Sequence, residues 1–190
     1  GCSKLTGELN LGGCTSLTSI GDSAFYNCSG LTSISLPSSL TSIGRLAFYG
    51  CSKLQPSATD QGVKYLGSEQ NPYLVLWDGT AITSSSYTVN PDCKIICYDA
   101  FWGCSKLTGE LNLGGCTSLT SIGDSAFYNC SGLTSISLPS SLTSIGSSAF
   151  YECSGLTSID LGNCTNLTSI ESSSFFWCER LEELILPASI

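Results

Sequence analysis

The feature that most constrains this sequence is a repeat of about 23 residues. In one round of the repeat the apolar positions are Leu31, Ile34, Leu36, Leu40, Ile43, Ala47, Phe48 and Cys51. Leu54 begins the next round 23 residues after Leu31, and residues 1–44 are identical to residues 103–146. A fixed period of this length is typical of solenoids, in which each unit contacts only its neighbours. We therefore expect residues 1–190 to form a single elongated solenoid.

Each repeat reads as a strand, a second extended segment and a compact turn. Residues 34–36 alternate apolar and polar side chains before a proline, which predicts a short strand with one buried face. Residues 40–44 form the second extended segment. Ala47, Phe48 and Cys51 are spaced i, i+1 and i+4, which is compatible with one helical or 3₁₀ turn. The predicted fold class is an α/β repeat solenoid, a superhelix with short parallel strands and a short helical turn in each coil.

One interval between the phenylalanines of successive repeats is much longer than the others. These residues are Phe25, Phe48, Phe101, Phe127, Phe150 and Phe175. The interval from Phe48 to Phe101 is 53 residues, and it holds one regular coil and an insert at residues 55–84. Residues 63–79 of the insert read as two strands around a polar turn at residues 67–72, which predicts a β-hairpin.

The insert also concentrates aromatic residues. The hairpin brings Tyr65, Tyr73 and Trp77 together in sequence. These side chains either cover an otherwise exposed coil edge or contact a ligand, since Tyr and Trp are enriched in interfaces. The sequence leaves both interpretations open, with Tyr73 and Trp77 as candidate binding residues.

At the level of the motif, the repeat resembles a known family. The pattern LxxIxLPxxLxxIxxxAFxxC occurs at residues 31–51 and again at residues 133–153, and it resembles the BspA-like, or treponemal-type, leucine-rich repeat. The resemblance covers the chain outside the insert. It implies a leucine-rich repeat superhelix, and a surface-exposed or secreted protein that adheres to host proteins and other cells. It also implies a binding scaffold and not an enzyme.

The twelve cysteines follow the repeat, and this argues against a disulfide framework. Most of them occupy the inward position of the AFxxC motif, where a cysteine behaves as a small apolar group. We expect free, buried thiols. Disulfides between stacked coils are an alternative, but equivalent positions present parallel Cβ directions that suit the disulfide dihedral poorly. Metal binding is disfavoured because Cys93, Cys97 and Cys104 lack a fourth ligand nearby and the chain has no histidine.

Charge and the missing histidine exclude several functions. The net charge of −8 and the pI of about 4.2 disfavour nucleic acid and anionic membranes as partners. The sequence contains no run of 18 apolar residues, so it predicts no membrane insertion of residues 1–190. Without histidine, hydrolase triads with an imidazole base and Cys-His dyads cannot form, which leaves only lysine- or carboxylate-based variants. Glu182 and Glu183 read as a solvated strand edge, and no glycine motif for nucleotide binding occurs. We therefore predict no enzyme activity and no cofactor.

The remaining function is binding, and the candidate surface is the outward face of the strands. Its predicted residues are Thr32, Ser33, Ser35, Thr134, Ser135, Ser137, Thr157, Ser158 and Asp160. The expected partner is a host extracellular or cell-surface protein or a glycan. The alternatives are a structural spacer or stalk that holds other domains away from the cell surface and, as a third reading, ice binding through the threonine rows.

The ends of the sequence fall inside repeats, which leads to two further expectations. The chain reads as a fragment of a longer protein at the cell surface or secreted, with its signal and anchor outside residues 1–190. Exposed strand edges at the ends of the solenoid would also allow end-to-end self-association.

Overall fold

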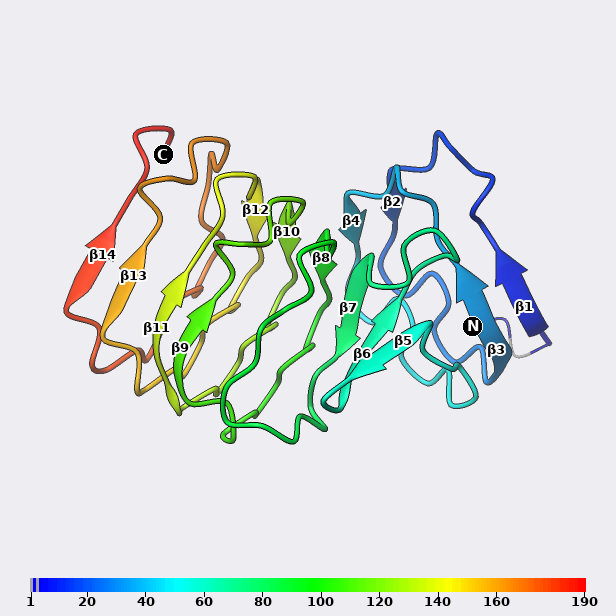
Figure 1. Ribbon diagram of the computed structural model, residues 1–190, viewed down its shortest axis with the longest axis horizontal. Coiled ribbons are helices and arrows are strands. Elements are labelled where there is room, and N and C mark those ends of the chain that lie inside the picture. Colours follow the sequence, from blue (N-terminus) through cyan, green and yellow to red (C-terminus); the bar gives the residue numbers. More distant parts are fainter. Residues whose placement is uncertain (1, 3) are drawn as a thin grey trace.

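The computed structural model describes residue 2 and residues 4–190, and it is a β-solenoid of stacked coils (Figure 1). Its strands, in chain order, are β1 (Thr6–Asn10), β2 (Ser19–Ile20), β3 (Gly30–Ser35), β4 (Ser42–Ile43), β5 (Ala58–Asp60), β6 (Val63–Leu66), β7 (Val75–Asp78), β8 (Ile95–Ile96), β9 (Gly109–Asn112), β10 (Ser121–Ile122), β11 (Leu133–Ser137), β12 (Ser144–Ile145), β13 (Ser158–Asp160) and β14 (Glu183–Ile185).

Two sets of strands run along the solenoid, and within each set the strands of successive coils are parallel. The longer strands form a four-stranded sheet in the order β14-β13-β11-β9 and a two-stranded sheet β1-β3. The two-residue strands form the pairs β2-β4 and β12-β10-β8. Equivalent residues face each other, so that Ile136 pairs with Leu111 on one side and with Ile159 on the other. This register confirms the predicted parallel solenoid.

The predicted helical turn is wrong: within the described residues the chain contains no helix, and so none that could cross a membrane. Residues 21–28 instead form consecutive tight turns. The amide of Tyr26 donates to the Ser23 carbonyl at 3.0 Å, within the coil, whereas the amide of Phe25 donates to the Ala47 carbonyl of the next coil at 2.8 Å. A helix would direct every amide along its own axis. Here every second amide donates to the neighbouring coil, so the hydrogen bonds between coils continue around the turn.

This turn geometry requires the left-handed backbone conformation at two positions four residues apart. Ser23 has φ 55° and Asn27 has φ 56°, and Gly50 and Gly103 occupy the place of Asn27 in later coils. Glycine and asparagine tolerate this conformation best. Their recurrence explains part of the polar pattern of the repeat.

Phenylalanines and cysteines line the core as two ladders. The rings of Phe101, Phe127 and Phe150 are fully buried and stack in series, with centroids 5.2 Å and 5.3 Å apart. Within the described residues all cysteines are free, and most are buried. Their thiols bond to the preceding coil: Cys130 donates to the Phe101 carbonyl at 3.0 Å and Cys153 to the Phe127 carbonyl at 3.1 Å. The cysteines therefore act as core residues that also satisfy a carbonyl of the neighbouring coil.

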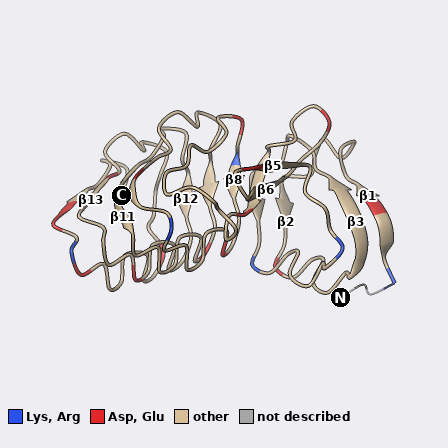
Figure 2. Ribbon diagram, turned by 60° about the horizontal axis from the view of Figure 1, so that its bottom comes forward, with Lys and Arg blue, Asp and Glu red and all other residues tan. Residues whose placement is uncertain are grey.

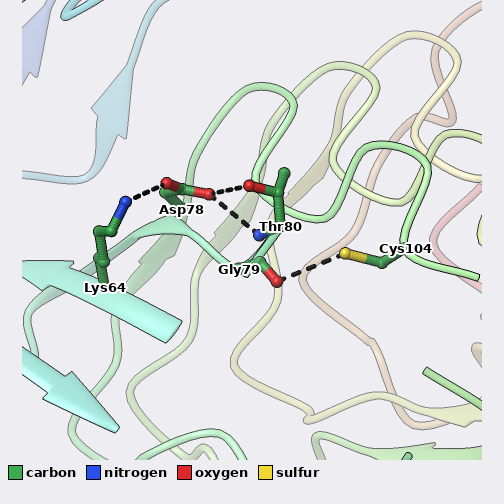
Figure 3. Close-up of polar contacts among 5 residues, drawn as sticks. All are labelled: Lys64, Asp78, Gly79, Thr80 and Cys104. Atoms are coloured by element: carbon green, nitrogen blue, oxygen red, sulfur yellow. Dashed lines mark hydrogen bonds and ion pairs between the residues drawn. The ribbon is translucent and has the colours of Figure 1, made fainter. Parts of the chain in front are cut away.

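The insert replaces a coil at one point of the stack. β5, β6 and β7 pair antiparallel, and β7 then pairs in parallel with β8. Figure 1 shows these strands between the N-terminal and C-terminal coils. Gly79 takes the place of a ladder phenylalanine, because its amide donates to the Ala100 carbonyl at 2.6 Å and its carbonyl accepts the Cys104 thiol at 3.4 Å (Figure 3). The ring of Phe101 fills the space where a side chain at residue 79 would lie.

Candidate binding site

The residues predicted as a binding surface lie on the outward side of the longer strands, which we call the strand face. Thr32 and Thr134 are exposed and sit beside register shifts in the pairs β1-β3 and β9-β11. The Thr157 hydroxyl donates to the Thr134 carbonyl at 3.1 Å, and the Ser137 hydroxyl donates to Glu110 Oε1 at 2.8 Å. Asp160 accepts the amide of Gly162 at 2.7 Å. Several of these polar groups are thus engaged in the strand face itself.

The structure divides the predicted strand-face residues into two groups. Thr32, Ser33 and Ser35 belong to the sheet β1-β3, and the others lie in or beside β11 and β13 of the four-stranded sheet. The insert separates the groups, since Ser35 bridges to Gly67 of the loop at residues 67–72. Ser33 and Ser35 line a hollow of about 710 Å³ between this loop and β3.

Tyr73 and Trp77, the predicted binding residues of the insert, have different surroundings. Tyr65 is buried, and its hydroxyl lies 2.6 Å from that of Tyr87. Tyr73 packs edge-on against the Tyr65 ring, with centroids 5.2 Å apart, and so helps to cover it. Trp77 is partly exposed and lines a cleft of about 550 Å³ that also has aromatic side chains on its other wall, described below.

An exposed row of aromatic rings follows the outer side of the turns, and the sequence analysis missed it. In each coil the residue after the ladder phenylalanine is aromatic, which was the available signal. This aromatic row consists of Tyr26, Tyr49, Trp102, Tyr128, Tyr151 and Phe176. Neighbouring rings stack: the centroids of Tyr128 and Tyr151 are 4.8 Å apart. Tyr49 is 60% exposed and Trp102 is 55% exposed, so the row is a surface feature and not a part of the core.

The aromatic row is interrupted where the insert enters, and a cleft of about 550 Å³ opens there. One wall of the cleft is the turn at residues 46–52. The other wall consists of Lys64, Trp77 and Asp78 of the insert together with residues 97–99. The cleft exists because β8 pairs with β7 of the insert, whereas β4 pairs with β2 alone. On the side of the longer strands the insert stays joined to the N-terminal coils, because the Leu36 amide donates to the Gly67 carbonyl at 3.1 Å.

Charged groups are few in this protein and scattered along the ribbon (Figure 2), but several of them border the cleft. Lys64 Nζ lies 2.8 Å from Asp78 Oδ2 and 5.9 Å from the centroid of Trp77, and Thr80 donates to Asp78 Oδ1 (Figure 3). Partial burial opposes ionisation of Asp78, but the bonds from Lys64 and Thr80 outweigh it and lower the pKa of this carboxyl. At Asp99 the effect of burial outweighs a hydrogen bond from Tyr98 and the charge of Arg45, and the pKa of this carboxyl is raised.

Beside the cleft, one arginine links the N-terminal coils to the C-terminal coils, and it lines a smaller hollow with Tyr98 and Asp124. Arg45, from the N-terminal side, places Nε 3.6 Å from Asp124 Oδ2 and its guanidinium carbon 5.4 Å from the centroid of Tyr98. In the repeated copy the equivalent residue is Ser147, although residues 1–44 and 103–146 are identical. The two copies thus diverge where one of them borders the cleft.

The arrangement is suited to binding. The cleft combines aromatic side chains with a few polar groups, as ligand sites commonly do, and its volume is within the usual range of about 300–1,000 Å³. Among the described residues, no cluster of three or more Cys, Asp or Glu is placed to hold a metal ion.

Comparison with solved structures finds several leucine-rich repeat proteins that are similar to this chain. A crystal structure of a leucine-rich cell surface protein from Faecalibacterium prausnitzii matches with 25% identity and a TM-score of 0.62, over 100% of this chain and 55% of that one. A leucine-rich repeat protein from Bacteroides ovatus matches with 32% identity and a TM-score of 0.52, over 92% of this chain and 42% of that one. A leucine-rich repeat protein from T. pallidum matches with 29% identity and a TM-score of 0.49, over 90% of this chain and 64% of that one.

The chain therefore spans less than two thirds of the length of each of these structures. No curated protein matches it. The family model for the BspA type leucine-rich repeat region matches residues 2–70 and 79–190, in 6 copies. The gap between the two matched ranges falls in the insert and contains β7. By this match, the chain belongs to the BspA-type leucine-rich repeat family.

Proposed function

We propose that this chain is a non-enzymatic binding module of a cell-surface or secreted protein, and that it mediates adhesion to a host protein, a glycan or another cell. The family resemblance supports this role, and so does the description of the F. prausnitzii structure as a cell surface protein. Both concern relatives. The observation on this chain that carries the proposal is the aromatic row.

The aromatic row exposes apolar area that the core does not require. Trp102 and Phe176 are at least half exposed, as is Trp177 beside the row, although the phenylalanine ladder already fills the interior of the same turns. Exposed apolar patches on soluble proteins commonly mark interaction sites, and tyrosine and tryptophan are enriched at their energetic centres. Stacking also holds the rings in place before a partner arrives, which reduces the entropy lost on binding.

A structural spacer is the second candidate, because the coils are so uniform. Residues 1–44 recur without change at 103–146, and equivalent residues stack in register. Rigidity and length suffice for a spacer, and near-identical coils supply both. This role does not explain why the turns expose aromatic rings.

A binding panel with matched variants separates the two roles. The purified monomer would be tested against extracellular-matrix proteins and glycans, together with three double variants. The first, Trp102→Ser with Tyr128→Ser, alters the aromatic row, and the second, Thr134→Glu with Ser135→Glu, alters the strand face. The control, Thr117→Glu with Ser118→Glu, places the same charges on an exposed turn away from both.

We expect saturable binding to at least one panel member, loss of binding in the aromatic-row variant, and no change in the control. Loss in the strand-face variant alone would keep the adhesive role but move the site to the predicted hydroxyl surface. A folded monomer that binds nothing on the panel would contradict the adhesive role and favour the spacer.

A further inference from the structure

Backbone amides on one edge of each turn hold the next coil. In the C-terminal part, the amides of Ser148, Phe150 and Glu152 donate to the carbonyls of Ser172, Ser174 and Phe176 at 3.0, 2.9 and 2.9 Å. Three alternate donors on one turn thus meet three alternate carbonyls on the next. The same pattern recurs at residues 23, 25 and 27, whose amides donate to residues 45, 47 and 49.

One turn inside the solenoid has this edge but no neighbour on it. The amides of Leu46, Phe48 and Gly50 are equivalent to those of residues 148, 150 and 152, yet they have no acceptor among the described residues. All three residues line the cleft. The next coil is not available to them, because Gly79 of the insert already donates to the Ala100 carbonyl. The insert has therefore replaced the natural partner of this edge and left the edge open.

The backbone at this edge keeps the geometry that pairs elsewhere. Leu46 has φ 54° and Gly50 has φ 74°, against 56° for Ser148 and 58° for Glu152. The three donors should therefore be arranged for the same kind of acceptor. A chain with carbonyls at alternate residues matches them, as residues 172, 174 and 176 do for the equivalent amides, whereas a single carboxylate or phosphate group does not present this series of acceptors. Polypeptide segments are known to add to open edges in this way.

The side chains around the cleft indicate what such a segment would carry. Where coils stack, the central acceptor residue is small and buried, as at Ala149 and Ser174, and an aromatic residue follows two positions later. The ring of Tyr49 stacks on Tyr26 at 5.4 Å and borders the cleft on its other side. An aromatic side chain on the incoming segment would extend the aromatic row across the gap.

We propose that the cleft binds a peptide segment of a partner protein through the backbone amides of Leu46, Phe48 and Gly50, with a small residue at the centre of the segment and an aromatic residue two positions later. The segment replaces the coil that the insert displaced. This site goes beyond the proposed adhesive function and does not depend on it, since adhesion through the aromatic row or the strand face can fail while the cleft still binds.

The test is a titration of isotope-labelled protein with a synthetic peptide of the sequence ESSSFFW, which is residues 171–177 of this chain. The amide signals of Leu46, Phe48 and Gly50 should shift and exchange more slowly with solvent as peptide is added. Those of Ser148, Phe150 and Glu152 serve as internal controls, because their carbonyl partners are already in place. A peptide with tryptophan in place of the third serine, which corresponds to Ser174, should not bind.

Two matched variants separate the cleft from the rest of the aromatic row. Tyr49→Ala should weaken peptide binding by roughly 2- to 12-fold, the effect of losing one aromatic pair. Tyr151→Ala, at the equivalent position of the other copy, should leave the affinity unchanged. Because Tyr49 is largely exposed, the first variant should fold normally, and the amide spectrum would show this.

Three results would overturn the proposal. One is the absence of any saturable shift at millimolar peptide, and another is a set of shifts confined to the strand face. The third is a concentration-dependent shift of the same three amides without peptide, since it would assign the cleft to a second copy of this chain.

Discussion

Gly79 offers a direct test of the insert's role as a substitute coil, through the variant Gly79→Ala. A methyl group at this position would meet the Phe101 ring at three atoms, and the least severe approach, to Cζ, is 2.8 Å. The backbone cannot move away easily, because the Gly79 amide bonds to the Ala100 carbonyl and its own carbonyl accepts the Cys104 thiol. The ring is equally confined, since it is fully buried and stacks on Phe127.

Overpacking of a close-packed core typically costs about 1–3 kcal/mol, and we expect about 2–3 kcal/mol because both contact partners are fixed. For a chain of this size that corresponds to a fall of roughly 4–12 °C in Tm. Chemical denaturation would give the free energy of unfolding, and a thermal melt followed by circular dichroism would give Tm. Gly115→Ala is the control, since nothing lies within 4 Å of its added methyl group, and it should change stability by less than about 0.5 kcal/mol.

A double-mutant cycle with Phe101→Leu identifies the cause. Leucine lacks Cε1 and Cζ, and its Cδ atoms can turn away from the added methyl group, so the cost of Gly79→Ala should fall to less than about 0.5 kcal/mol. If alanine at residue 79 were tolerated as well as alanine at residue 115, the insert would not stack on the Phe101 coil as described. If the cost persisted in the leucine background, strain elsewhere would be its source.

Three further predictions concern the core. In the native protein near neutral pH, a thiol reagent should label Cys2 and Cys14 alone, because the other cysteines are buried or half-buried, and unfolding should expose all twelve; rapid labelling of further thiols would contradict the packing. Burial raises the pKa of Tyr65 to about 12 and also raises that of Tyr87, so both protons leave more readily from the unfolded chain. The stability from this pair should be complete below pH 10 and decline toward pH 12, visible as tyrosinate absorbance that appears with unfolding. Phe127→Ala should cost about 3–5 kcal/mol by denaturation, and a loss under about 1 kcal/mol would mean that the ladder does not hold the coils together.

The sequence was sufficient to predict the parts of the fold that depend on the repeat. The apolar positions of residues 31–51 predicted stacked coils with parallel strands, and the ladder phenylalanines indeed stack. The helical turn was predicted wrongly because a spacing of i, i+1 and i+4 fits consecutive tight turns as well as a helix. Asn27 and Gly50, which recur at the left-handed positions, were the evidence against a helix.

The cleft could not be predicted in this way, because it depends on a choice between partners. β7 could have followed β4 in the stack, but it pairs with β8 instead, and no local pattern decides between these edges. The exposed aromatic row was within reach of the sequence, since an aromatic residue follows every ladder phenylalanine. The buried positions define the period of the repeat by themselves, and the exposed aromatic position adds nothing to that pattern.

The open edge at residues 46–50 also has a mechanical consequence. Coils elsewhere share hydrogen bonds around the turn, whereas across the cleft the N-terminal coils are held by few links, among them the Leu36 amide to Gly67 and the Arg45 contact with Asp124. In a stack whose strength is the sum of its neighbouring interfaces, the weakest interface yields first. A pull on the N-terminus should therefore unfold the chain before Leu54 as one unit while the remaining coils stay folded, and the released segment would span at most about 180 Å when fully extended. At a surface exposed to shear, such a seam would act as an extensible link that absorbs load before the rest of the solenoid unfolds.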